Sequence, residues 1–222
     1  RPTEGRVLLD GQATAERTVA ELARHVGLCF QDPDRQVFSG SVRAEVAFGP
    51  RNLGQRGSAL DAAVDAALVA VGLEGEGRTN PYDLGYSRRK LLAIASVLAM
   101  GTPVVVLDEP TTGQDARGVA RVGNIVHALA AEGRTVIAIS HDMAFVAEHF
   151  QRVVAMRAGS VVLDGRPAEV FAEASWPALE STYLEPPHSA RVGARLGLGS
   201  TPTVGSVVDA LGARAPAGSA RG

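Results

Sequence analysis

Two adjacent carboxylates, Asp108 and Glu109, directly follow the apolar run "PVVVL" at 103–107. The run has the length and composition of a buried strand, which puts the pair at a strand end. There Asp108 can hold Mg²⁺, directly or through water, and Glu109 can polarise a water molecule that attacks a phosphate. Capping of a turn, or pairing with an arginine, is the alternative role for two such residues.

Two further polar residues follow other apolar runs. Gln31 ends "VGLCF", and His141 lies just after "TVIAIS". A lone glutamine or histidine at a strand end is usually a loop residue with local hydrogen bonds. In a parallel sheet, however, the carboxyl ends of the strands share one edge, and ligands collect there. Together with the Asp108–Glu109 pair, these residues predict one site.

The elements that position this site alternate along the chain. Strands are expected at 6–11, 26–30, 103–107, 135–140, 152–156 and 160–165, and helices at about 19–25, 39–53, 59–72, 88–100 and 116–131. Alternation of apolar strands with helices is typical of a parallel sheet covered by helices. Within the helical block the pattern predicts a break at Gly49-Pro50, an N-cap at Ser58 and a helix end near Gly72.

The last two strands flank Gly159 and predict a hairpin, followed by a short helix in "PAEVFAE". The expected division is an α/β core over residues 1–170, with a helical subdomain at about 39–100. A small, mostly helical region at 171–211 follows, and a disordered tail of low complexity is expected at 212–222.

Composition narrows the class of protein. With 222 residues and 45% hydrophobic content, the chain can bury a core as one domain with a small appendage. A net charge of -2 gives no broad basic surface, so no nucleic-acid partner is expected. The longest apolar stretch, at 91–100, is too short to cross a bilayer, which restricts any membrane role to a peripheral one. The single cysteine, Cys29, predicts a buried inert thiol and a reducing compartment.

Three stretches resemble motifs of an ABC-type ATPase. They are "VGLCFQDPDRQVFSGSVRAEVAFGP" for the Q-loop, "VVVLDEPTTGQD" for the Walker B motif and D-loop, and "VIAISHDM" for the H-loop. The first is most similar to the energy-coupling-factor importers, whose ATPases drive uptake of vitamins or of cobalt and nickel. The similarity runs from about residue 1 to 170 and continues more weakly through "LEPPHSARVGARLG". It implies a P-loop NTPase-like α/β fold with a parallel sheet and a helical subdomain.

The resemblance also implies roles for single residues. Gln31 would join the nucleotide's metal site to a membrane partner, Asp108 would organise Mg²⁺, and Glu109 would be the general base. His141 would contact the γ-phosphate of ATP, and Asp115 would cross a dimer interface as the D-loop. The segment 36–53 is expected to dock the membrane partner, because it carries apolar residues expected to be exposed, such as Val37 and Phe38, beside Gln31. Ordinary core packing of Phe38 and Phe48 is the alternative.

The phosphate loop is the first departure from the family pattern. No G-x-x-x-x-G-K-[ST] motif occurs, and the only lysine is Lys90. That loop supplies the backbone N–H groups and the lysine that hold the β- and γ-phosphates. Since "RPTEGRVLLDG" resembles the sequence after the P-loop helix, we expect a fragment that begins just downstream of its phosphate loop and is inactive and poorly folded alone. A real loss, leaving a scaffold module, is the alternative.

The signature motif, usually LSGGQ, is the second departure. Leu84-Gly85-Tyr86-Ser87-Arg88 aligns with it, and only the leucine matches. In the family this loop and the following helix N-terminus bind a nucleotide held by the opposite subunit. Ser87 could replace the missing hydroxyl, and Arg88, Arg89 and Lys90 either add positive charge or form a solvated helix start.

The favoured function is therefore an ATP-binding and ATP-hydrolysing subunit of an energy-coupling-factor importer at the cytoplasmic face of the membrane. It would dimerise around Mg-ATP with a second ABC ATPase subunit, as a homodimer, heterodimer or tandem fusion, and act on an integral-membrane partner that selects a metal ion or vitamin. The alternative is a degenerate, non-hydrolysing half of an asymmetric pair. A soluble ABC protein of repair or translation is a third hypothesis, which "FSGSVRAEVAFGP" disfavours.

Overall fold

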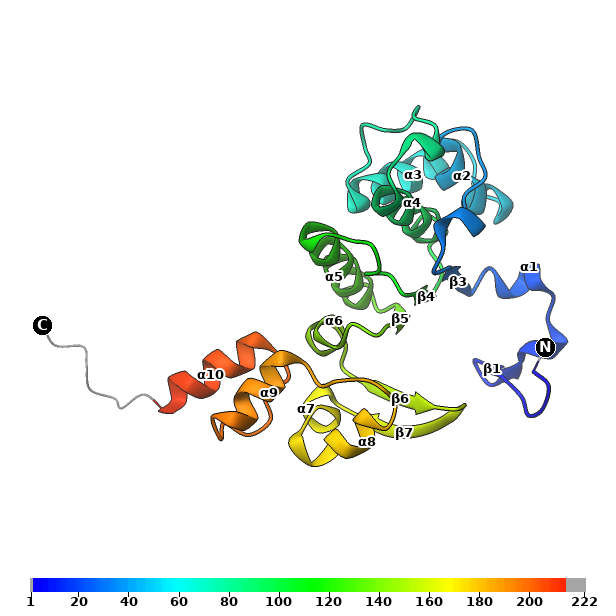
Figure 1. Cartoon of the computed structure of the whole chain (residues 1–222). Helices are drawn as coiled ribbons and strands as arrows, with labels where there is room; N and C mark the ends of the chain where they lie inside the picture. The colour runs from blue at the N-terminus through cyan, green and yellow to red at the C-terminus, as the bar shows by residue number, and fades with distance from the viewer. Residues whose placement is uncertain (1, 215–222) are drawn as a thin grey trace, which may run out of the picture. The chain divides into compact units, whose positions relative to one another are not determined.

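The structure, a computed structural model, describes residues 2–214 and divides into two compact units, one ending at Ile139 and one starting at Ser140 (Figure 1). The first unit contains β1 (Leu8–Leu9), β2 (Gln12–Ala13), α1 (Val19–Leu22), β3 (Val26–Cys29), α2 (Val42–Asn52), α3 (Gly57–Val71), α4 (Tyr86–Leu98), β4 (Val104–Asp108), α5 (Ala116–Ala131) and β5 (Thr135–Ile139). The second contains α6 (Met143–His149), β6 (Val153–Arg157), β7 (Ser160–Gly165), α7 (Pro167–Val170), α8 (Trp176–Glu180), α9 (His188–Arg195) and α10 (Val204–Arg214).

The sheet of the first unit is parallel, as predicted, and the structure gives its strand order as β3-β4-β5. Cys29 of β3 is paired in register with Leu107 of β4, and Asp108 of β4 is paired with Ile139 of β5. The carboxyl ends of all three strands therefore lie at one edge of the sheet. This confirms the structural premise of the predicted site.

One face of this sheet is buried and the other is open. Val105 and Leu107 are completely buried, whereas Leu28, Ile137 and Ile139 are about half exposed. The buried face packs against α4, and the two layers approach closely at Gly27. A Cβ atom added there would lie 2.6 Å from Val97 Cγ1. Only glycine allows this approach.

We expect Gly27→Ala to lower the free energy of unfolding by about 1–3 kcal/mol, because the new methyl group must push α4 away from the sheet. Urea denaturation followed by circular dichroism measures the change. Gly75→Ala is the matched control, since an added Cβ there meets no atom within 4 Å. Equal stability of the two variants would contradict the tight packing of β3 against α4.

Helices α2, α3 and α4 form a helical layer that buries Val46, Leu68 and Leu92. The predicted break at Gly49-Pro50 is wrong, because α2 continues to Asn52 with Pro50 inside it. Pro50 lies in the last turn, so its missing N–H removes only one helical hydrogen bond.

Two other helix details in this layer were predicted from the sequence. The predicted cap at Ser58 is wrong, since α3 starts at Gly57 with Arg56 as N-cap. Gly72 ends α3 in a left-handed conformation, with a φ of 68°, as predicted.

Boundaries at the two ends of the described chain also differ from the prediction. Of the strand predicted at 6–11, only β1 forms, paired with β2 just beyond that range, and α1 stops at Leu22. The tail predicted from residue 212 is wrong for 212–214, which continue α10, and the rest of it lies outside the described residues.

The second unit contains the predicted hairpin, since β6 and β7 pair antiparallel around Gly159. Its core surrounds the buried Phe171 and Leu179 and includes the inner faces of α6 and β6. The predicted boundary near residue 170 refers to the family's domain and stays a prediction. Within residues 2–214, no helix has both the length and the apolar content needed to span a membrane.

Candidate functional site

The carboxylates Asp108 and Glu109 lie half-buried at the carboxyl end of β4. Gln31 follows the end of the neighbouring strand β3, and its side chain is exposed. Because β3 and β4 are parallel and in register, the structure brings Gln31 and the carboxylate pair to the same edge of the sheet. Oxygen donors at such an edge suit Mg²⁺.

Glu109 has an unusual backbone conformation. Its φ of 48° is in the left-handed region, which costs a non-glycine residue roughly 1–2 kcal/mol. Neighbouring groups hold it there: its N–H donates to the Ile139 carbonyl at 2.8 Å, and Thr112 Oγ1 donates to its carboxylate at 3.2 Å. Such strain persists where the surrounding structure fixes a residue, often at functional sites.

The most buried member of the site was not among the predicted site residues. Lys90, on α4, is completely buried, and its Nζ donates a 2.8 Å hydrogen bond to the Gln31 carbonyl. Burial lowers the pKa of Lys90, while the negative charges of Glu109, Asp108 and other nearby acidic groups act in the opposite direction. The solvated reading of "RRK" is therefore wrong for Lys90. The sequence did carry a signal, because Lys90 shares the apolar helix face of Ala93, Ile94 and Val97 at spacings of three, four and seven.

The loop that follows Gln31 is attached to α4 at further points. Gln36 accepts from the Phe30 N–H at 3.0 Å and donates to the Ala93 carbonyl at 2.8 Å. Arg89 pairs with Asp34 at 2.9 Å. We call residues 30–36 the tethered loop, since these bonds fix it to α4.

Cys29 lies beside this cluster and is buried, as predicted. Burial raises the pKa of its thiol to about 12. At pH 8 its thiolate fraction is then roughly a thousandfold below that of an ordinary thiol. We expect a thiol reagent such as DTNB to label the native protein very slowly and the guanidinium-unfolded protein at once. Equal rates in the two states would show that the β3–α4 layer opens readily.

The signature-like segment contacts the D-loop segment of the same chain. Ser87 Oγ donates to Gln114 Oε1 at 2.9 Å, and Gln114 Nε2 donates back to the Ser87 carbonyl at 3.0 Å. The Tyr86 ring lies against Gly113, where an added Cβ would be 2.8 Å from Tyr86 Cε1. The structure therefore brings these two predicted motifs together, and it occupies the Ser87 hydroxyl with a bond inside the chain.

The remaining predicted residues have local roles. Leu84 is buried, and Gly85 is the N-cap of α4. Asp115 is the N-cap of α5 and accepts from the Gly118 N–H at 2.7 Å. His141 belongs to the second unit, so its place relative to the carboxylates stays a prediction.

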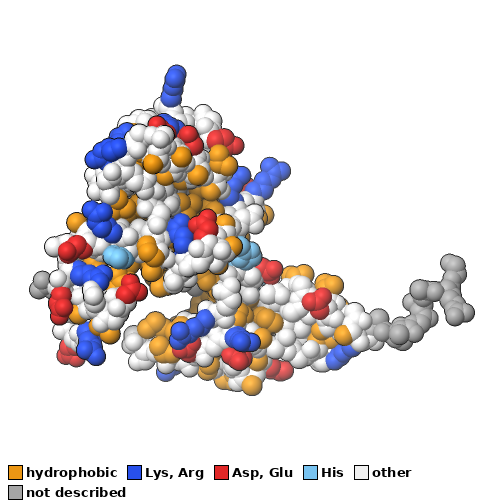
Figure 2. All heavy atoms as spheres, turned by 180° about the vertical axis from the view of Figure 1, so that it is seen from behind, with side chains coloured by type: hydrophobic (Ala, Val, Ile, Leu, Met, Phe, Trp, Pro, Cys, Tyr) orange, Lys and Arg blue, Asp and Glu red, His pale blue; other side chains and the backbone are white. Residues whose placement is uncertain are grey.

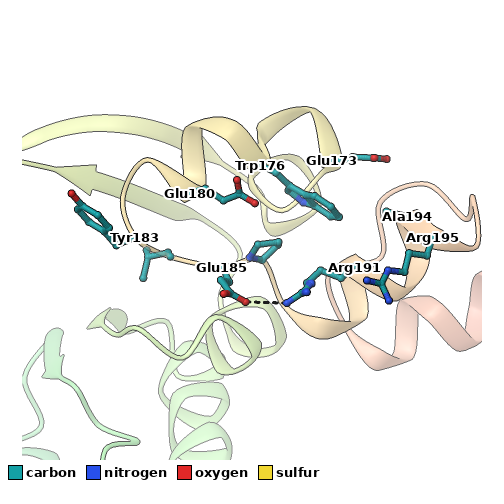
Figure 3. Close-up of a pocket in the computed structure, with 10 residues that line it drawn as sticks. Glu173, Trp176, Glu180, Tyr183, Glu185, Arg191, Ala194 and Arg195 are labelled. Carbon is teal, nitrogen blue, oxygen red and sulfur yellow. Dashed lines mark hydrogen bonds and ion pairs between the residues drawn. The ribbon is translucent and has the colours of Figure 1, made fainter.

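The second unit holds a pocket of about 590 Å³ beside α8 and α9. Figure 3 shows Trp176 over it and the ion pair between Glu185 and Arg191, whose atoms lie 2.9 Å apart. None of the predicted site residues line this pocket.

A parallel sheet with paired carboxylates at the end of its central strand, joined to a helical layer, places oxygen ligands where α/β nucleotide-binding domains hold their ligands. Comparisons with known proteins give the family. A model described as "ABC transporter" matches residues 1–112. The chain belongs to the ABC transporter family, as the motifs predicted, and its fold is that of the family's ATP-binding domain.

Individual relatives support the same family assignment. A putative ABC transporter ATP-binding protein of Methanosarcina acetivorans is 41% identical over 192 residues, which are 86% of this chain and 31% of that protein. The energy-coupling factor transporter ATP-binding protein EcfA of Methanocaldococcus jannaschii is 39% identical over 175 residues, or 78% of this chain and 63% of that protein. The solved structure of cbiO1 from Clostridium perfringens, part of the ABC transporter complex cbiONQ, matches with a TM-score of 0.70 at 33% identity and covers 89% of this chain and 78% of that one.

The chain thus spans less than a third of the length of the Methanosarcina relative, at 31%.

Proposed function

We propose that the chain belongs to the ATP-hydrolysing subunit of an energy-coupling-factor importer, which couples hydrolysis to uptake of a metal ion or vitamin. The observation that carries this is the carboxylate edge, where Glu109 is held in a strained conformation beside Asp108 and Gln31. The similarity to EcfA and to cbiO1 supports the importer class. The membrane partner would select the substrate.

In this proposal the side chains of Asp108 and Gln31 would hold Mg²⁺. Their oxygen atoms fit that ion, which would neutralise charge on the nucleotide's phosphates. Among the described residues there is no group of three or more acidic, histidine or cysteine side chains able to hold a metal ion, so phosphate oxygens would complete the ligand set. Glu109 would accept the proton of the attacking water, His141 would contact the γ-phosphate, and Asp115 would face the second subunit.

The proposed membrane-partner surface is the aromatic pair Phe38 and Phe48. Their rings pack edge to face with centroids 4.8 Å apart, and both are about half exposed. The expectation that Val37 is exposed beside them is wrong, because its side chain is buried in the core. The buried carboxylate of Glu45 accepts from the N–H groups of Phe38 and Ser39, at 3.1 and 2.7 Å, and so fixes the segment. Figure 2 shows that hydrophobic side chains reach the surface between charged ones on the face it presents. A rigid, exposed aromatic pair suits a peripheral contact with a membrane protein.

The bond between Ser87 and Gln114 favours a second candidate, the non-hydrolysing half of an asymmetric pair. In that role the signature-like segment would stabilise its own D-loop segment rather than bind a nucleotide of the opposite subunit.

Phosphate release from Mg-ATP tests the proposal. Since the 222 residues contain no phosphate-loop motif, the assay uses the chain joined behind a strand, a G-x-x-x-x-G-K-[ST] loop and a helix. Hydrolysis that depends on Glu109 supports the ATPase. ATP binding without any hydrolysis, alone or with a second ABC subunit, supports the second candidate.

A further inference from the structure

The only lysine of the chain is a completely buried cation. Its Nζ is fixed by the hydrogen bond to the Gln31 carbonyl, 2.8 Å away. Burial lowers the pKa of this ammonium group, and the nearby carboxylates of Glu109, Asp108 and Asp32 act in the opposite direction. A buried charge is stable only beside opposite charge and hydrogen-bond partners. The acidic residues at the sheet edge therefore explain why the cation is tolerated there.

The same arrangement acts on any cation that approaches these carboxylates. We propose that Lys90 is a fixed counter-charge that keeps free Mg²⁺ from binding tightly at Asp108, so that the site takes the metal together with a phosphate-bearing nucleotide. This rests on the function proposed above, because it assumes that Asp108 and Gln31 supply the metal ligands.

Lys90 repels free Mg²⁺ at Asp108 because, unlike a surface lysine, it cannot move away from the approaching ion. Its side chain has no exposed surface, and its ammonium group is bonded to the backbone of the tethered loop. In a partly buried site the repulsion between a divalent ion and a fixed ammonium is screened only weakly. The phosphates of a nucleotide add negative charge and oxygen ligands, which offset that repulsion. Metal binding then depends on the nucleotide.

Titration with Mn²⁺ in the absence of nucleotide, followed by water proton relaxation, tests the proposal on the same joined chain that the phosphate-release assay uses. Lys90→Gln removes the charge but keeps an N–H donor for the Gln31 carbonyl, and Lys90→Arg keeps the charge. We expect Lys90→Gln to bind Mn²⁺ on the order of tenfold more tightly than the wild type, and Lys90→Arg to bind it as the wild type does. Lys90→Met should show the same gain as Lys90→Gln, and serves if the glutamine variant does not fold.

Adding Asp108→Asn to Lys90→Gln checks where the additional Mn²⁺ affinity arises. The second substitution should abolish the gain in Mn²⁺ affinity. Unchanged affinity in both uncharged variants overturns the proposal. So does an equal gain in Lys90→Arg, which would mean that altered packing rather than charge controls binding, and so does a gain that survives Asp108→Asn. The titration measures metal affinity and needs no hydrolysis. A protein that is inactive in the phosphate-release assay therefore counts against the proposed ATPase but not against the proposed role of Lys90.

Discussion

Replacing Glu109 with glutamine should leave ATP binding nearly unchanged and slow hydrolysis by about 10²-fold or more, the range for loss of a general base. The amide has nearly the size of the carboxylate and can still accept the bond from Thr112 Oγ1. The backbone bond to the Ile139 carbonyl does not involve the side chain at all. The variant therefore removes the base with little change in the fold, so that ATP binding should persist while the rate of hydrolysis falls.

The measurement uses the chain joined to a phosphate loop, with ATP affinity from calorimetry and the rate from phosphate release. Glu132→Gln is the matched control, because Glu132 is an exposed carboxylate of the same unit, 3.6 Å from Arg134. It should hydrolyse ATP at the parent rate. Hydrolysis by Glu109→Gln at that same rate would remove Glu109 from the mechanism.

Replacing Phe38 with glutamate should detach the protein from its membrane partner. A carboxylate cannot pack edge to face against Phe48, and its desolvation would oppose burial in an apolar contact. ATP binding should be unaffected, since the side chain of Phe38 is 59% exposed. Co-purification of a tagged chain with the integral-membrane component from detergent extracts measures the loss, which we expect to be nearly complete.

Val69→Glu provides the control for this variant. Val69 lies on α3 in the same helical layer and is 62% exposed, so it receives the same charge at a similarly exposed apolar position. Its complex should co-purify normally. Recovery of the partner with Phe38→Glu at the level of this control would place the docking surface elsewhere.

Sequence patterns predicted the elements whose signals are local. The alternation of apolar runs with helices predicted a parallel sheet, and the bounds of α5 agree with the predicted 116–131. The apolar run at 103–107 placed Asp108 and Glu109 correctly at a strand end. These features depend on residues within one element or its immediate neighbours.

The parts that were missed depend on contacts between distant residues. Gln36 holds the tethered loop through Ala93, which is 57 positions away, and Lys90 reaches Gln31 across 59 positions. No periodicity reports such a pairing. Lys90 was read as part of a charged triplet, although its spacing placed it on the buried face of α4. Polar residues inside a core are a weakness of pattern-based prediction, because their burial is explained only by the partner they meet.

The left-handed backbone at Glu109 has a consequence for protein engineering. Glycine adopts that conformation without strain, so a variant library selected only for resistance to heat would favour Glu109→Gly. Under the proposed function, such a selection would enrich proteins that outlast the wild type and no longer turn over ATP. Directed evolution of this domain therefore needs a screen for turnover beside the screen for thermal tolerance, and codon 109 is where the two screens would disagree.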